Sequence, residues 1–114
     1  MHILRDAMLL RIFIGEDDKA GHRPLYEAIV LKAREMGLAG ATVLRGPMGF
    51  GHSSHLHTTK ILRLSQDLPL VIEIVDVEEK IEKFVAAIEP IMGSALVTTE
   101  NVKVIRYGEG GPCD

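Results

Sequence analysis

The first regular segment of the chain, residues 7–15 (AMLLRIFIG), is almost entirely apolar, with Arg11 as its one charged residue and Gly15 at its end. In an extended strand, successive side chains point to opposite faces, so this segment has two distinct faces. One face carries Met8, Leu10, Ile12 and Ile14, and the other carries Leu9, Arg11 and Phe13. Because both faces are mainly apolar, the pattern predicts a strand within a sheet.

The spacing changes to that of a helix after a polar segment, residues 16–23. Pro24 suits the first turn of a helix, where its missing N–H costs nothing, and Gly37 is a typical helix end. The positions between them form an apolar stripe at helical spacing: Leu25, Ala28, Ile29, Ala33 and Met36. A second strand is expected over residues 38–45.

β-Branched residues alternate in residues 68–75 (LPLVIEIV), which predicts a third strand. Asp76, with Glu79 three residues later, resembles a capping box at the start of a second helix. The apolar stripe of this helix is expected to be Val77, Ile81, Phe84 and Ile88, with Pro90 at its end. A final strand is expected over residues 96–106, whereas residues 56–64 fit no single type of element.

The predicted order of elements is therefore strand, helix, strand, strand, helix, strand. Two split βαβ units of this kind form a ferredoxin-like α/β (α+β) sandwich, with one antiparallel sheet and both helices on one of its faces. The other face would carry Leu9, Arg11, Phe13, Val71, Glu73, Val75, Ile105 and Tyr107. This set is too apolar to be left in water, yet it includes charges that can pair, so we expect a homo-oligomer.

Length and composition fit one globular domain. The chain has 114 residues, 46% of them hydrophobic and 25% charged, and we expect flexible ends at residues 1–6 and 107–114. A net charge of −3 and an aromatic content of 4% without Trp argue against nucleic-acid binding. One cysteine, Cys113, and the lack of an apolar segment typical of a signal peptide or membrane helix lead us to expect a cytoplasmic protein.

A glycine-rich segment follows the second predicted strand: residues 40–57 read GATVLRGPMGFGHSSHLH. Glycine permits backbone conformations closed to other residues and lets the chain approach a ligand closely. Function in small domains is concentrated on such loops. We therefore expect loop 46–60 to respond to a ligand or partner.

Three stretches carry a resemblance to a known family: GATVLRGPMGFG, IGEDDK before PLYEAI, and DLPLVIEIVD. They resemble the domain of unknown function 190 family, which is itself similar to PII-type signalling proteins. The resemblance implies ferredoxin-like subunits that form a homotrimer, with a long loop between the second and third strands. It also implies adenine-nucleotide binding in clefts between subunits, and signalling through that loop to a protein target such as a membrane transporter or channel.

The predicted topology brings three segments to one end of the subunit: residues 16–23, residues 46–67 and the turn at 90–94. We expect a cleft for a small anionic ligand there, and the resemblance favours an adenine nucleotide. The expected ligand-binding residues are Lys19 and Arg45 for phosphate, the backbone of Gly46, Gly49 and Gly51 as a cradle, Phe50 near the base, and His52 beside them. The alternative is that the glycines only shape turns and that Phe50 fills a subunit contact.

A cluster of loop histidines suggests a second kind of site. His55 and His57 would share one side of an extended segment, and His52 lies close by, as a divalent metal site requires. Glu16 and His22 could complete such a site from the neighbouring segment. Loop histidines are more often hydrogen-bonding or pH-responsive groups, so metal binding is the alternative to nucleotide binding.

Catalytic motifs are not evident in the sequence. Ser53, Ser54, Thr58 and Thr59 lie near histidines, but their context resembles neither a nucleophile elbow nor an oxyanion hole. We therefore expect a protein that is not an enzyme. A purely structural interaction module remains the third possibility.

Overall fold

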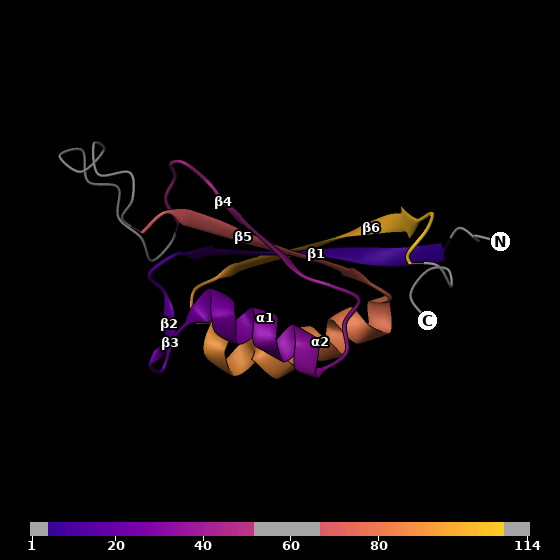
Figure 1. Ribbon diagram of the computed structural model, residues 1–114, viewed down its shortest axis with the longest axis horizontal. Coiled ribbons are helices and arrows are strands. Elements are labelled where there is room, and N and C mark those ends of the chain that lie inside the picture. Colours follow the sequence, from indigo (N-terminus) through magenta and orange to yellow (C-terminus); the bar gives the residue numbers. More distant parts are fainter. Residues whose placement is uncertain (1–4, 52–66, 109–114) are drawn as a thin grey trace.

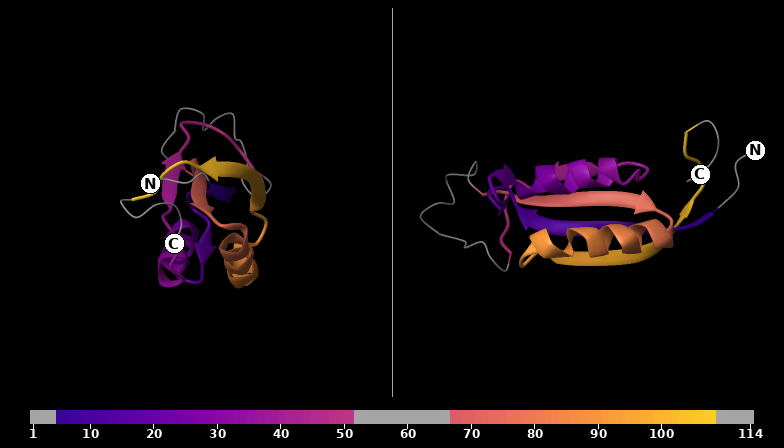
Figure 2. Two further views of the ribbon diagram at one scale, coloured as in Figure 1. Left: turned by 90° about the vertical axis from the view of Figure 1, so that its right-hand side faces the viewer. Right: turned by 90° about the horizontal axis from the view of Figure 1, so that it is seen from below.

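The computed structural model describes residues 5–51 and 67–108 (Figure 1). One antiparallel sheet has the strand order β4-β5-β1-β6. Its strands are β1 (Arg5–Gly15), β4 (Thr42–Arg45), β5 (Pro69–Asp76) and β6 (Leu96–Val104). Helices α1 (Leu25–Glu35) and α2 (Glu78–Met92) lie side by side on one face of this sheet (Figures 1 and 2). The arrangement confirms the predicted ferredoxin-like sandwich.

The core lies between the sheet and the two helices. Along β1, Leu10 and Ile12 are fully buried, whereas Phe13 on the opposite face is 37% exposed. The predicted division of β1 into a core face and an open face is therefore confirmed. The other core residues are Ile14, Leu25, Ile29, Ala33, Leu70, Ile72, Ile74, Ile81, Phe84, Ile88 and Met92.

The ends of α1 follow the sequence closely. Gly37 has a φ of 74° just after the last turn, a conformation that favours glycine and ends the helix as expected. Pro24 is the cap residue rather than the first helical residue, and it pairs with Lys19 in a short hairpin. This hairpin consists of β2 (Lys19–Ala20) and β3 (Arg23–Pro24), where the sequence predicted only a loop.

The expected capping box at the start of α2 is wrong. Val77 is the cap residue, and no side chain within the described ranges caps the helix. Asp76 is instead the buried last residue of β5, and its two carboxylate oxygens accept hydrogen bonds from the N–H groups of Val77 (2.7 Å) and Ala39 (2.9 Å). The carboxylate is therefore a structural acceptor that ties the α1–β4 connection to the end of β5.

The end of α2 also differs from the expectation. The helix continues past Pro90 to Met92, and Gly93, at a φ of 58°, ends it. In the last turn, proline removes only one hydrogen bond, and the buried Met92 side chain adds packing beyond it. Helix length here is set by the core contact rather than by the proline.

Three strand boundaries shift by a few residues. β1 begins at Arg5, so two residues of the expected flexible N-terminal end belong to the sheet. β4 begins only at Thr42, because the N–H of Ala39 is bound to Asp76 instead of a neighbouring strand. β6 ends at Val104, and the segment after it folds back so that the Tyr107 hydroxyl donates to the Ala39 carbonyl at 2.5 Å. No helix in the described ranges is long and apolar enough to cross a membrane.

Candidate ligand-binding site

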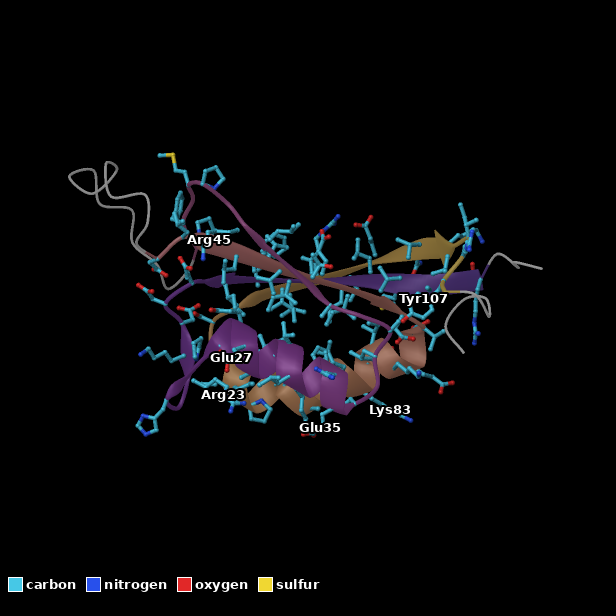
Figure 3. The ribbon with its side chains drawn as sticks, viewed as in Figure 1. Arg23, Glu27, Glu35, Arg45, Lys83 and Tyr107 are labelled. Atoms are coloured by element: carbon cyan, nitrogen blue, oxygen red, sulfur yellow. The ribbon has the colours of Figure 1, made fainter. Side chains whose placement is uncertain are left out.

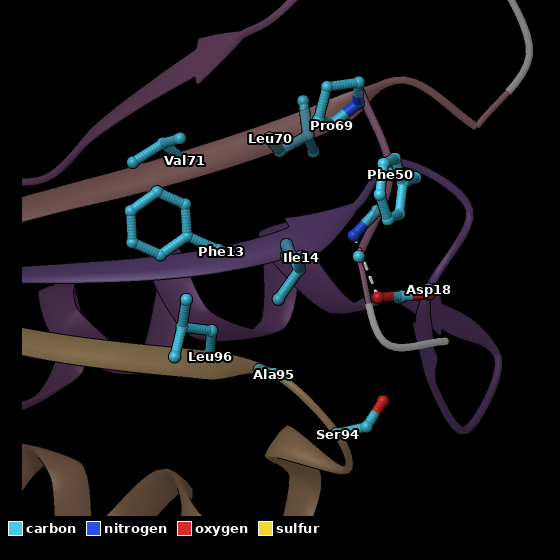
Figure 4. Close-up of a pocket in the computed structure, with 12 residues that line it drawn as sticks. Phe13, Ile14, Asp18, Phe50, Pro69, Leu70, Val71, Ser94, Ala95 and Leu96 are labelled. Atoms are coloured by element: carbon cyan, nitrogen blue, oxygen red, sulfur yellow. Dashed lines mark hydrogen bonds between the residues drawn. The ribbon is translucent and has the colours of Figure 1, made fainter. Parts of the chain in front are cut away.

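Three connecting segments meet at one end of the sheet, as the topology predicted. Because β1 and β4 both run antiparallel to β5, the connections that follow them emerge at the same end, where α2 also ends. They enclose a pocket of about 220 Å³ (Figure 4). Its lining residues are Phe13, Ile14, Gly15, Asp18, Phe50, Gly51, Pro69, Leu70, Val71, Ser94, Ala95 and Leu96.

The floor of the pocket is apolar. Phe13 lies opposite Val71 on β5 and opposite Leu96 on β6, so three side chains from neighbouring strands adjoin one another on the open face (Figure 4). Phe50 also lines the pocket and is 71% exposed. A large aromatic ring beside a hollow apolar floor provides a surface on which a planar group can stack.

Pro69 explains two of the glycines in the loop. The N–H of Gly46 donates to the Pro69 carbonyl at 2.8 Å. A Cβ atom on Gly46 or on Gly49 would lie 3.0 Å from the Pro69 ring, closer than ordinary packing allows. These two glycines therefore permit close packing against Pro69, and the chain continues to Phe50 and Gly51, which line the pocket.

Carboxylates surround Gly15 at the end of β1. The Gly15 N–H donates to Oδ2 of Asp18 at 2.9 Å, and the Asp17 N–H donates to Oδ1 of Asp67 at 3.2 Å. A Cβ atom on Gly15 would lie only 2.5 Å from that same Asp67 oxygen. Asp67 itself has a φ of 46°, the left-handed region that non-glycine residues seldom adopt. Among the described residues that line the pocket, Asp18 is the one carboxylate.

The two predicted phosphate-binding cations lie near the pocket but do not line it. Arg45 Nη2 forms an ion pair with Glu16 Oε2 at 2.5 Å, in which the arginine side chain is 60% exposed and the glutamate 21%. Lys19 is exposed on β2. Figure 3 places Arg45 at the loop end of the molecule, far from Tyr107. A phosphate group would reach Arg45 only in competition with Glu16.

Residues 7–104 match the family described as DUF190, Uncharacterized ACR, COG1993. The chain belongs to this family. A UPF0166 protein of Aquifex aeolicus (strain VF5) is 42% identical over 99 residues, which cover 85% of this chain and 91% of the relative. A UPF0166 protein of Methanocaldococcus jannaschii is 33% identical over 101 residues, which cover 88% of this chain and 93% of the relative.

Solved structures show the same fold. CPII from Thiomonas intermedia K12, in a structure bound to ADP and bicarbonate, matches with a TM-score of 0.66 at 18% identity, covering 93% of this chain and 95% of that chain. A structure of the same nitrogen regulatory PII-like protein bound to ADP, AMP and bicarbonate matches with a TM-score of 0.65, also at 18% identity, covering 93% and 94%. This DUF190 chain therefore has a PII-like fold.

The histidines of the alternative metal site lie outside the described residues: His52, His55 and His57. Glu16, which was expected to complete that site, instead pairs with Arg45. Within the described part of this DUF190 chain, no group of three or more histidine, cysteine or acidic side chains is placed to hold a metal ion.

Sequence reasoning missed three side chains that line the pocket. The sequence placed Asp18 only within the polar segment 16–23, Ser94 only within a turn, and Phe13 on the face expected to contact other subunits. The signal for Asp18 was its spacing from Gly15, since an aspartate three residues beyond the end of a strand can accept a hydrogen bond from the chain it follows. The turn at residues 90–94 was expected beside the cleft, but no local pattern distinguished Ser94 within it.

The open face of the sheet carries a network of ion pairs. Arg11 Nε lies 3.0 Å from Glu73 Oε2, and Arg11 Nη1 lies 2.6 Å from Glu100 Oε1. The hydrogen bonds that Arg11 donates to Glu73 and to Glu100, together with the negative charges of the two carboxylates, raise the pKa of its guanidinium. The prediction that charges on this face pair with one another is therefore confirmed, and Glu100 is an additional member. Thr42 lies opposite Glu73 and Thr98 opposite Arg11, so the network is part of a polar row across the sheet. Apolar residues flank this row along the strands: Leu9, Phe13, Leu44, Val71, Val75 and Leu96.

Proposed function

We propose that this DUF190 chain is a non-enzymatic PII-like regulatory protein of the cytoplasm that binds a small anionic ligand, an adenine nucleotide. The observation that carries the proposal is the pocket formed by Phe13, Asp18, Phe50 and Ser94 at the base of the glycine-rich loop. It combines an apolar floor, an exposed aromatic ring and a few polar groups, as small-molecule sites do. The presence of ADP and AMP in structures of the PII-like CPII supports the same choice of ligand.

The assembly that fits this proposal is a homotrimer with ligands in the clefts between subunits. Part of the pocket floor, Phe13, Val71 and Leu96, belongs to the open face of the sheet. A neighbouring subunit on that face would form a further wall of the pocket and would shield apolar side chains that are now exposed. Ligand binding and assembly would then depend on the same surface.

The proposed roles of the ligand-binding residues are those expected from the sequence, and of these residues Phe50 and Gly51 line the pocket. Phe50 would stack on the base, and the backbone from Gly46 to Gly51 would cradle the ligand. Arg45 would release its ion pair with Glu16 and bind the phosphate instead. Lys19 would add positive charge nearby. His52 would lie beside the ligand as the next residue after Gly51.

Isothermal titration calorimetry tests the proposed ligand directly. The panel consists of AMP, ADP, ATP, cyclic nucleotides and divalent metals. We expect at least one adenine nucleotide to give a binding heat, and we expect Arg45→Ala to bind that nucleotide with lower affinity than the wild type. A binding heat for zinc or copper that disappears when His52, His55 and His57 are all replaced by alanine would favour the metal site instead. A silent panel would refute nucleotide binding and favour a structural interaction module.

We further propose that loop 46–60 transmits the ligand state to a protein target, a membrane transporter or channel. At the start of this loop, Met48 and Phe50 are 54% and 71% exposed, which suits a contact surface. The double variant Met48→Ser, Phe50→Ser should lose the target in a pull-down. Leu31→Ser is the matched control, because Leu31 is 41% exposed on α1, away from both the loop and the open face of the sheet. If the wild type, the double variant and the control variant all recover the same amount of the target, the loop is excluded as the element that contacts it.

A further inference from the structure

The polar groups of the pocket are acceptors rather than cations. Among the described residues that line it, Asp18 and Ser94 have the only polar side chains, and none is basic. The rest of the lining is aliphatic, aromatic or glycine. A carboxylate beside an apolar surface favours a ligand that offers N–H donors at that point, since an acceptor placed there would be repelled and left unpaired.

The Asp18 carboxylate is held in a defined orientation. Its Oδ2 accepts the Gly15 N–H at 2.9 Å, and the Asp18 carbonyl accepts the N–H of Leu25 at 2.7 Å, which fixes the backbone against α1. The side chain lies between Phe50 and Ser94 (Figure 4). Among the described residues, the Gly15 N–H is the one donor to this side chain, and an ionised carboxylate has about four acceptor positions, which leaves capacity for a ligand.

We propose that Asp18 is the residue that selects the base: its carboxylate accepts a hydrogen bond from the exocyclic amine of a 6-aminopurine stacked between Phe50 and the floor of the pocket. This inference rests on the proposed nucleotide-binding function. A 6-oxopurine places a carbonyl oxygen where the amine would be, so two acceptors would face each other. With the base in this orientation, the site therefore favours adenine nucleotides over those of hypoxanthine and guanine.

AMP and IMP test this selectivity, because they differ at the 6-position of the purine and carry the same phosphate. We expect calorimetry on the wild-type protein to show AMP binding at least about tenfold more tightly than IMP, the size expected for one hydrogen bond to a charged group. In Asp18→Asn, the amide can also donate to an oxygen, so the preference should fall to about threefold or less. Asn also keeps an acceptor for the Gly15 N–H, and circular dichroism checks that the variant folds.

Asp17→Asn is the matched control, since Asp17 is an exposed acid of the same segment whose side chain does not line the pocket. It should keep the full preference for AMP. Equal binding of AMP and IMP by the wild type, or an unchanged preference in Asp18→Asn, would overturn the role of Asp18 while leaving nucleotide binding intact. Absence of binding by AMP, ADP and ATP alike would overturn the proposed function, and this inference with it.

Discussion

Arg11 lies directly opposite Glu73 across the two central strands of the sheet, with Nε and Oε2 3.0 Å apart, on the face that the helices leave uncovered. Glu100 binds the same guanidinium from β6. One cation thus pairs with two carboxylates, on a sheet face where apolar residues lie on both sides of the polar row. A surface of this kind can be buried in an assembly only if each charge keeps a partner.

Arg11→Met should weaken self-association of the chain. Without the guanidinium, Glu73 and Glu100 would repel each other and remain unpaired when a neighbouring subunit covers the face. We expect light scattering and sedimentation to show a shift toward single subunits at micromolar concentration. Lys32→Met, which breaks the exposed helix pair with Glu35, is the control and should leave the assembly unchanged. A wild-type chain that is already monomeric would contradict the proposed homotrimer.

Asp76→Ala should destabilise the fold by about 2–3 kcal/mol, because the N–H groups of Val77 and Ala39 would lose their buried acceptor. Asp76→Asn keeps one carbonyl oxygen and should cost less. Chemical denaturation of the three proteins measures the free energy of unfolding. Equal stability of wild type and Asp76→Ala would mean that water replaces the carboxylate at both N–H groups.

The sequence was sufficient for the fold because its periodic patterns are strong. The alternation along β1 and the helical spacing of Leu25, Ile29 and Ala33 each identify a core face without knowledge of the partner element. The role of Asp76 was missed because its partner Ala39 lies 37 residues away. A local capping pattern cannot reveal an acceptor whose donor comes from a distant connection.

The candidate site was only partly predictable for the same reason. Topology alone brings the ends of β1, β4 and α2 together. The glycines identified the segment after β4 as a candidate binding loop. The pairing of Arg45 with Glu16 was not foreseen, since the two residues are 29 positions apart and no local pattern links them. Nor does sequence show that Phe13 and Ser94 share a pocket with Phe50.

Gly15→Ala should cost about 1 kcal/mol and weaken ligand binding. The new Cβ would lie 2.5 Å from Oδ1 of Asp67, so that carboxylate must move and release the Asp17 N–H. Gly40→Ala is the control: its Cβ would meet nothing within 4 Å, and we expect a change within about 0.5 kcal/mol. Denaturant unfolding and calorimetry measure the two effects. Unchanged stability and binding in Gly15→Ala would show that the Asp67 side chain moves aside freely.

The ion pair between Asp6 and Lys103 should make a pH-dependent contribution to the stability of the fold. The hydrogen bond and positive charge of Lys103 hold the pKa of Asp6 below its usual value. Because the folded-state pKa is lowered, the pair contributes at neutral pH and its contribution is lost as the pH falls through that pKa. Carbon NMR titration of Asp6 should show a higher pKa in Lys103→Met than in the wild type. The thermal midpoints of the two proteins should converge in acid, and a gap that persists there would contradict this account.

Glu16 and the phosphate of a ligand should compete for Arg45. Glu16→Gln removes the competing charge, so this variant should bind AMP about threefold to tenfold more tightly than the wild type. Arg45→Ala should lower the affinity for AMP by about tenfold. Adenosine lacks the phosphate and serves as the control ligand, and both variants should bind it as the wild type does. In the double variant, the gain from Glu16→Gln should disappear, since it acts only through Arg45. A gain that persists without Arg45, or that extends to adenosine, would show that Glu16 acts on the pocket by a route other than this ion pair.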